Sequence, residues 1–263
     1  MRVESITSAQ NPKIKTLLSL QEKSRLRKEM GLFVVEGRRE LEHCAKAGFE
    51  VETVFYCPEI CGFVPDYKHI VDIPRQLYEK VAYRGGTEGI IAEVKARTLT
   101  LNELKLKEQP LIAVLESVEK PGNLGAVLRS ADAAGVDAVL ICDPYTDLYN
   151  PNLIRASIGA VFTVPVVCCD SIEAINWLKD KGIRIYTAQL QDSEWYYDTD
   201  MTGGTAIAIG TEATGLTELW REAANAHIKI PMLGRLDSLN ASVSAAILLF
   251  EAVRQRNTYN VKQ

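Results

Sequence analysis

LIAVLESVEKPGNLGAVLRSADAAGVDAVLIC, residues 111–142, is the stretch that decides the fold of this chain. Its first run, 111–117, is almost continuously apolar, which is typical of a strand buried on both faces. A helical pattern follows at 125–135 and ends on a glycine, and a second apolar run occupies 137–142. A strand, a helix and a second strand in this order predict a βαβ unit with parallel strands.

The same alternation continues along the C-terminal half. Apolar runs at 163–169, 183–189, 205–210 and 227–231 are separated by helical stretches, and a last helix is expected over 241–256. Six such runs predict an α/β domain in which helices cover both faces of one parallel sheet.

The N-terminal half has a smaller α/β pattern. We expect a basic helix over 13–30 and strands over 31–37, 51–57 and 89–95. These elements predict a second compact domain, shorter than the C-terminal one.

A domain boundary is expected where the core pattern stops. RTLTLNELKLKEQ (97–109) is polar and follows no core pattern. We therefore expect one domain over 1–97, a linker over 98–110 and a second domain over 111–263.

Composition alone is that of an ordinary globular protein. The chain has 263 residues, of which 47% are hydrophobic and 24% charged, and its net charge is −4. Residues 1–39 are different, because they hold nine Lys and Arg against four Glu, a local charge of +5. This basic end is either a phosphate-binding surface or a solvated helix face. The candidate phosphate ligands are Lys13, Lys15, Arg25, Arg27, Lys28, Arg38 and Arg39.

The cysteines and apolar runs indicate a cytoplasmic protein that binds neither a metal nor a membrane. Cys57 and Cys61 have no second ligand pair at zinc spacing, and the three histidines are scattered. The N-terminal residues show no secretory signal, and no apolar run approaches the roughly 18 residues that span a bilayer. We expect six reduced thiols in a reducing compartment.

Polar residues and glycines cluster after three of the expected strands. Ligands of open parallel sheets bind beyond the carboxyl ends of the strands, so these clusters are candidate site residues. Taken singly, each is also explained as a turn, a helix cap or a solvated loop. The three clusters contain Gly122, Asn123, Gly125 and Arg129, then Gly210, Glu212 and Gly215, then Gly234, Ser238 and Asn240. A fourth, weaker cluster contains Asn152, Arg155, Ser157 and Gly159.

Common nucleotide-binding and hydrolase motifs are missing. Gly122 and Gly125 have the wrong spacing for a dinucleotide loop, although Asp143 is near the right distance for a ribose ligand, so a nicotinamide enzyme remains a weak alternative. The sequence has neither a phosphate loop nor the G-x-S-x-G turn of a serine hydrolase.

Three segments resemble the motifs of a known family. N-L-G-A-V-L-R (123–129), G-T-E-A-T-G-L (210–216) and I-P-M-L-G-R-L-D-S-L-N-A-S-V-S (230–244) resemble, in order and separation, those of the SpoU/TrmH family. R-A-S-I-G-A-V-F-T-V-P-V (155–166) is similar to the stretch between its first two motifs. Ala241 departs from the pattern, because many relatives have Val there. The N-terminal half resembles the family's substrate-binding domain, a small α/β RNA-binding fold.

The resemblance implies an enzyme of the SPOUT superfamily that uses S-adenosyl-L-methionine (AdoMet) to methylate ribose 2′-hydroxyls in RNA. It implies a C-terminal trefoil knot, which the residue pattern by itself does not indicate. It also implies a homodimer, and RNA phosphates as the ligands of the basic N-terminal residues. The N-terminal domain favours 23S ribosomal RNA as substrate. A tRNA methyltransferase and a non-catalytic RNA-binding factor are the alternatives.

Site residues follow from the same resemblance. Gly210, Ile230 and Leu239 are expected to contact AdoMet, with Met232 and Ala241 as neighbours. Arg129 is the expected catalytic arginine, and Asn123 positions it or the substrate. The remaining expected catalytic-site residues, which complete the pocket, are Glu212, Ser238 and Asn240.

Overall fold

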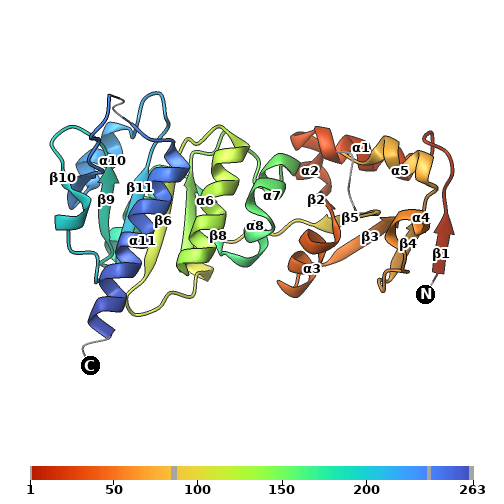
Figure 1. Ribbon diagram of the computed structural model, residues 1–263, viewed down its shortest axis with the longest axis horizontal. Coiled ribbons are helices and arrows are strands. Elements are labelled where there is room, and N and C mark those ends of the chain that lie inside the picture. Colours follow the sequence, from red (N-terminus) through yellow and green to blue (C-terminus); the bar gives the residue numbers. More distant parts are fainter. Residues whose placement is uncertain (1, 84–87, 236–237, 261–263) are drawn as a thin grey trace. The chain divides into compact units, whose positions relative to one another are not determined.

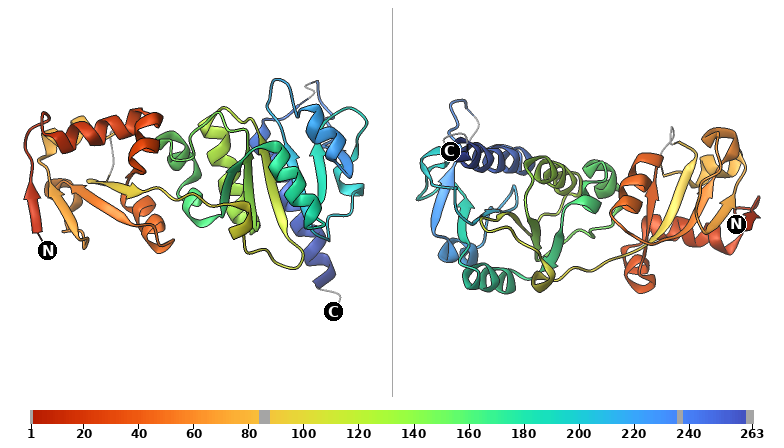
Figure 2. Two further views of the ribbon diagram at one scale, coloured as in Figure 1. Left: turned by 180° about the vertical axis from the view of Figure 1, so that it is seen from behind. Right: turned by 90° about the horizontal axis from the view of Figure 1, so that it is seen from below.

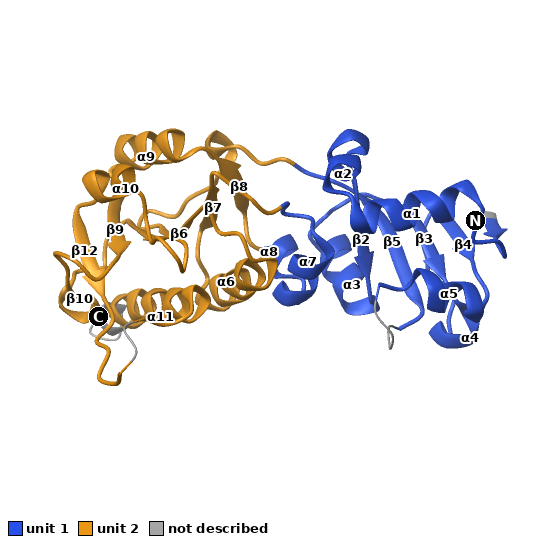
Figure 3. Cartoon of the chain, turned by 90° about the horizontal axis from the view of Figure 1, so that it is seen from above, with its two compact units in different colours: residues 1–97, 147–163 blue, residues 98–146, 164–263 orange. Residues whose placement is uncertain are grey.

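A computed structural model describes residues 2–83, 88–235 and 238–260, which form two compact units (Figure 3). Unit 1 consists of residues 1–97 and 147–163, and unit 2 of residues 98–146 and 164–263. The chain therefore passes between the units near residues 97, 146 and 163. Each unit is described by itself below.

Unit 2 contains a seven-stranded sheet in which all strand pairs are parallel (Figure 1). Its strand order is β10-β12-β9-β11-β6-β7-β8. The strands are β6 (Leu111–Glu116), β7 (Ala138–Cys142), β8 (Val166–Cys169), β9 (Arg184–Ala188), β10 (Glu194–Trp195), β11 (Thr205–Ile209) and β12 (Ala226–Lys229). The predicted α/β class and parallel sheet are confirmed. The sequence pattern missed β10, which has only two residues.

Helices cover both faces of this sheet. Helices α6 (Pro121–Ala134) and α11 (Ala241–Asn260) pack against each other on one face (Figure 2). Helices α9 (Ser171–Asp180) and α10 (Glu218–Ala223) contact each other on the opposite face. Strands β6, β7 and β11 are consequently buried at every residue. This burial explains why their sequences are continuous apolar runs.

The expected linker contributes to the core of unit 2. Leu101 is 3% exposed, in a short 3₁₀ helix over Leu101–Glu103, and Leu99, Leu104 and Leu106 pack against the same core. Single leucines between polar and charged residues cover the core without producing a sustained helical or alternating pattern, so the segment looks polar in sequence.

Unit 1 contains a mixed five-stranded sheet in the order β1-β4-β3-β5-β2. Its strands are β1 (Arg2–Ser5), β2 (Leu32–Glu36), β3 (Val51–Tyr56), β4 (His69–Asp72) and β5 (Ile90–Lys95). Its helices are α1 (Pro12–Glu22), α2 (Ser24–Met30), α3 (Arg38–Lys46), α4 (Pro58–Cys61), α5 (Arg75–Val81), α7 (Pro151–Ser157) and α8 (Ala160–Thr163). The single helix expected over 13–30 is two helices, because Lys23 between them is extended.

The segment 147–163 is tied to unit 1 by a buried ion pair and an aromatic cluster. Arg27 Nε lies 2.6 Å from Asp147 Oδ2, and the two side chains are 4% and 11% exposed. Phe33 on β2 stacks on Tyr149, with 4.1 Å between the ring centroids, and also contacts Phe162. A segment expected in the C-terminal domain therefore completes the core of the N-terminal unit.

Two sequence predictions concern the whole chain. The trefoil knot is not tested by the strand order and stays a prediction. Among the helices of residues 2–83, 88–235 and 238–260, none has the length and apolar character needed to span a bilayer.

Candidate active site

The loop after β11 folds into a tight hairpin. Thr211 and Gly215 exchange two backbone hydrogen bonds, of 3.2 and 3.1 Å. A Cβ on Gly210 would lie 2.2 Å from the carbonyl carbon and oxygen of Gly215, so only glycine fits there. Glycine is required at this position because its own loop crosses it.

Three loops meet at a cluster of polar side chains. Asn123, in the first turn of α6, donates through Nδ2 to Glu212 Oε1 at 3.0 Å. Asn240 Nδ2 donates to the same oxygen at 2.7 Å and to Asn123 Oδ1 at 3.1 Å. The three expected motifs are therefore joined directly to one another by Asn123, Glu212 and Asn240.

Asn240 has a second role at the start of α11. Its Oδ1 accepts hydrogen bonds from the backbone N–H of Ser242 at 2.9 Å and from the Ser242 hydroxyl at 2.6 Å. This is the geometry of a helix N-cap. Opposite ends of one amide therefore serve the helix cap and the polar cluster, and the expected catalytic-site role of Asn240 stays a prediction.

Lys120 extends the cluster to a fourth side chain. Its Nζ lies 2.6 Å from Glu212 Oε2. Hydrogen bonds lower the pKa of the Glu212 carboxyl below its usual range, and the largest effect comes from Lys120, followed by Asn123. Glu212 is consequently ionised at neutral pH, and its two oxygens accept from three side-chain donors.

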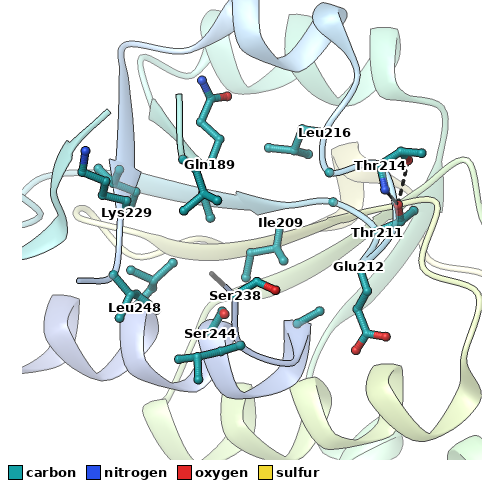
Figure 4. Close-up of a pocket in the computed structure, with 18 of the residues that line it drawn as sticks. Gln189, Ile209, Thr211, Glu212, Thr214, Leu216, Lys229, Ser238, Ser244 and Leu248 are labelled. Carbon is teal, nitrogen blue, oxygen red and sulfur yellow. Dashed lines mark hydrogen bonds between the residues drawn. The ribbon is translucent and has the colours of Figure 1, made fainter. Parts of the chain in front are cut away.

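A cavity of about 680 Å³ lies at the carboxyl ends of β9, β11 and β12 (Figure 4). Figure 4 shows Lys229 and Glu212 at opposite ends of it. Eight of the expected site residues line this cavity, namely Gly210, Glu212, Ile230, Met232, Ser238, Leu239, Asn240 and Ala241. Residues 236 and 237 of the third motif lie outside the described residues.

Two expected site residues do not line the cavity. Asn123 reaches it only through its hydrogen bonds to Glu212 and Asn240. Arg129, near the middle of α6, is exposed. It makes no hydrogen bond or ion pair with any described residue. The structure thus brings Asn123, and not Arg129, into the cluster where the three loops meet.

Sequence reasoning missed part of the wall. Gln189, Leu190 and Gln191 follow β9 and line the cavity, as does Arg221 on α10. The available signal was two glutamines, Gln189 and Gln191, directly after a strand of the sheet. Lys120 was missed because a lone lysine before a proline carries no motif.

The expected phosphate ligands of unit 1 divide into two groups. Arg27 is buried, pairs with Asp147 and donates to the carbonyl oxygens of Leu20 and Gln21, so its expected role in RNA binding is contradicted. A basic residue inside a basic stretch looks exposed until its buried partner, 120 residues away, is known. The other six are exposed, namely Lys13, Lys15, Arg25, Lys28, Arg38 and Arg39.

The described part of the chain has neither a clustered metal-ligand set nor a disulfide. No group of three or more His, Cys, Asp or Glu side chains there is arranged to hold a metal ion. The six cysteines, all of which are described, form no disulfide.

A family model described as the SpoU rRNA methylase family matches residues 110–250, more than half of the sequence. This chain belongs to the SpoU rRNA methylase family. A second model, described as an MRM3-like substrate binding domain, matches residues 11–92 of this SpoU chain. The family expected from the three motifs is confirmed, and the nicotinamide alternative is excluded.

Individual relatives of this SpoU chain cover most of its length. The 23S rRNA (guanosine-2′-O-)-methyltransferase RlmB of Vibrio cholerae is 38% identical over 193 residues, which are 71% of this chain and 78% of that protein. The crystal structure of an RNA 2′-O ribose methyltransferase is 38% identical, with a TM-score of 0.83, over 96% of this chain and 99% of the other.

A third relative was solved with a ligand. It is the SpoU methyltransferase AviRb from Streptomyces viridochromogenes, in complex with the cofactor AdoMet. Its identity to this chain is 27% and its TM-score 0.85, over 94% of this chain and 100% of that one.

Proposed function

We propose that this chain transfers a methyl group from AdoMet to a ribose 2′-hydroxyl of 23S ribosomal RNA. The observation that carries the proposal is the joining of three loops by Asn123, Glu212 and Asn240 beside one cavity. The activity and substrate agree with the name of the RlmB relative.

The cavity fits AdoMet in size and chemistry. Its volume of about 680 Å³ lies within the range of about 300–1,000 Å³ that is usual for small-molecule sites. Ile209, Leu216 and Leu248 supply apolar walls, while Gly210 and Ile230 place backbone groups along it. When bound, AdoMet supplies a methyl group already activated on sulfur. The tasks left to the protein are to orient the two reactants and to handle one proton.

We assign to Arg129 a contact with the RNA. A guanidinium resists deprotonation in proteins, which argues against a role as general base. Its exposure, without any described partner, leaves the guanidinium available for a bidentate contact with the phosphate of the target nucleotide. The same charge would stabilise the alkoxide that develops on the ribose.

Unit 1 is proposed to hold the RNA. Its six exposed basic residues provide contacts to phosphate, so RNA binding weakens steeply with salt. The proposal includes a homodimer and a cytoplasmic location.

The experiment is methyl transfer from labelled AdoMet to total ribosomal RNA and to total tRNA in separate reactions. We expect label in 23S RNA, at a 2′-O-methylated nucleotide. Label in tRNA alone would establish the alternative substrate. The absence of label in either, with RNA binding retained, would identify a non-catalytic RNA-binding factor.

A further inference from the structure

Glu212 is the point at which the walls of the cavity are joined. Its Oε1 accepts from Asn123 and Asn240, and its Oε2 accepts from Lys120. A protonated carboxyl turns one acceptor site into a donor, and none of these three groups offers an acceptor in the observed contacts. The full set of hydrogen bonds therefore requires the ionised carboxylate.

Lys120 supplies the counter-charge. Among the charged groups of the described residues, Lys120 is the one that contacts Glu212. The hydrogen bond with Glu212, helped by the negative charge of Glu119, raises the pKa of Lys120, which keeps its ammonium charged. The other contacts are neutral, from Asn123 and Asn240 and from the backbone of Ala241. Because Pro121 begins α6, the backbone of Lys120 is fixed at the helix start.

The consequences reach the cofactor cavity through Asn240. The same amide that holds Glu212 also caps α11, and Ser238, Leu239 and Ala241 on either side of it line the cavity. If Glu212 turns away, Asn240 loses one of its partners, and the third loop is no longer fixed against the second.

We propose that Lys120 is a positioning residue, which holds Glu212 as an ionised bridge between the three loops. It thereby keeps the loops that form the wall of the AdoMet cavity fixed to one another. This inference rests on the proposed function, because it concerns the same site.

The test compares the full-length chain with Lys120→Met and Lys120→Arg. The matched control is Lys107→Met, because Lys107 is 70% exposed against 71% for Lys120 and pairs with Asp137 outside the cavity. The probe is S-adenosyl-L-homocysteine, whose affinity is measured by calorimetry between pH 5 and pH 8. Thermal unfolding of each variant is recorded at the same pH values.

We expect Lys120→Met to weaken binding by about threefold at pH 7.5, as is usual for an exposed ion pair. Removing the ammonium raises the pKa of Glu212, so the loss grows towards pH 5. Lys120→Arg is expected to restore the wild-type profile, and Lys107→Met to leave it unchanged.

Superimposable pH profiles for Lys120→Met and wild type, at equal thermal stability, would overturn the inference. So would a failure of Lys120→Arg to recover binding. If the wild-type chain itself bound no S-adenosyl-L-homocysteine, the proposed function would fall first, and this inference with it.

Discussion

Thr217 donates both its backbone N–H, at 2.8 Å, and its hydroxyl, at 2.6 Å, to the carboxylate of Glu116. Glu116 is the last residue of β6 and is 3% exposed, whereas Thr217 ends the loop that follows β11. The two strands are neighbours in the sheet, so this pair fixes the second motif's loop to the strand that leads into the first motif.

Glu116→Ala removes both acceptors. Hydrogen bonds to a charged group contribute about 1.5–3 kcal/mol each, and the two donors of Thr217 regain some water, so we expect a loss of about 2–3 kcal/mol in the free energy of unfolding. Urea unfolding measures it. Glu116→Gln retains one carbonyl acceptor and should lose less; equal losses for the two variants would contradict the role of the carboxylate.

Gly210→Ala is expected to disrupt the hairpin, because its Cβ would overlap the Gly215 backbone at 2.2 Å. We expect AdoMet binding to fall by at least tenfold, measured by calorimetry. Gly122→Ala is the control, since nothing lies within 4 Å of its Cβ position on α6, and it should stabilise the chain by about 0.5–1 kcal/mol. Undiminished AdoMet binding by Gly210→Ala would show that the loop has room to shift.

Arg129→Ala separates catalysis from cofactor binding. Arg129 does not line the cavity, so we expect the affinity for S-adenosyl-L-homocysteine to remain within about twofold. Loss of a group that stabilises developing charge should lower kcat by about 10²–10³-fold in single-turnover methylation of RNA. Arg129→Lys keeps the charge without the bidentate geometry. Near-full turnover of Arg129→Lys with unchanged RNA affinity would show that neither assigned role is right.

Arg27 and Lys28 are neighbours in sequence, but we expect substitution of Arg27 to change stability and substitution of Lys28 to change RNA binding. Arg27→Met leaves Asp147 buried without its partner, which typically costs about 3–5 kcal/mol of stability. Lys28→Met, at an exposed position, should leave stability unchanged. It should reduce the slope of log affinity for RNA against log salt concentration by about 1, the value for one lost phosphate contact. Urea unfolding and RNA titrations at several salt concentrations measure both. Loss of RNA affinity in a fully stable Arg27→Met variant would restore Arg27 as a phosphate ligand.

Glu93 on β5 makes stability depend on pH. Burial, and to a lesser extent the charge of Glu52, raises the pKa of its carboxyl from 4.5 to about 7, and Oε1 has no partner among the described residues. The folded state holds this proton to higher pH than the unfolded state does. Stability is therefore lost as pH rises from about 4.5 to about 7, by up to about 3 kcal/mol.

Glu93→Gln removes this dependence. We expect the variant to be more stable than wild type at pH 8 and to approach it at pH 5, as judged from urea midpoints. Glu50→Gln, with a side chain that is 67% exposed in wild type, is the control. A wild-type midpoint that does not change between pH 5 and pH 8 would show that Glu93 stays ionised in the folded state.

The sequence predicted the strands of the unit 2 sheet better than it predicted the boundaries between the two units. Six strands were found, and β6, β7 and β11 stand out most clearly because they are buried at every residue and their sequences are continuous apolar runs. The segment 147–163 was expected in the C-terminal domain, yet Tyr149 and Phe162 pack on Phe33 of unit 1. Local patterns show that an aromatic residue is buried, but they do not show against which partner.

The amino-acid order alone determined that three loops follow strands of one parallel sheet, and that they carry Asn123, Glu212 and Asn240. Periodicity and motif spacing are local properties, and the parallel sheet places the ends of its strands on one edge. Only the tertiary structure decided that Lys120 joins Glu212, that Arg27 is buried and that Arg129 is not in the cluster. Those facts depend on contacts between residues up to 120 positions apart, which no local pattern contains.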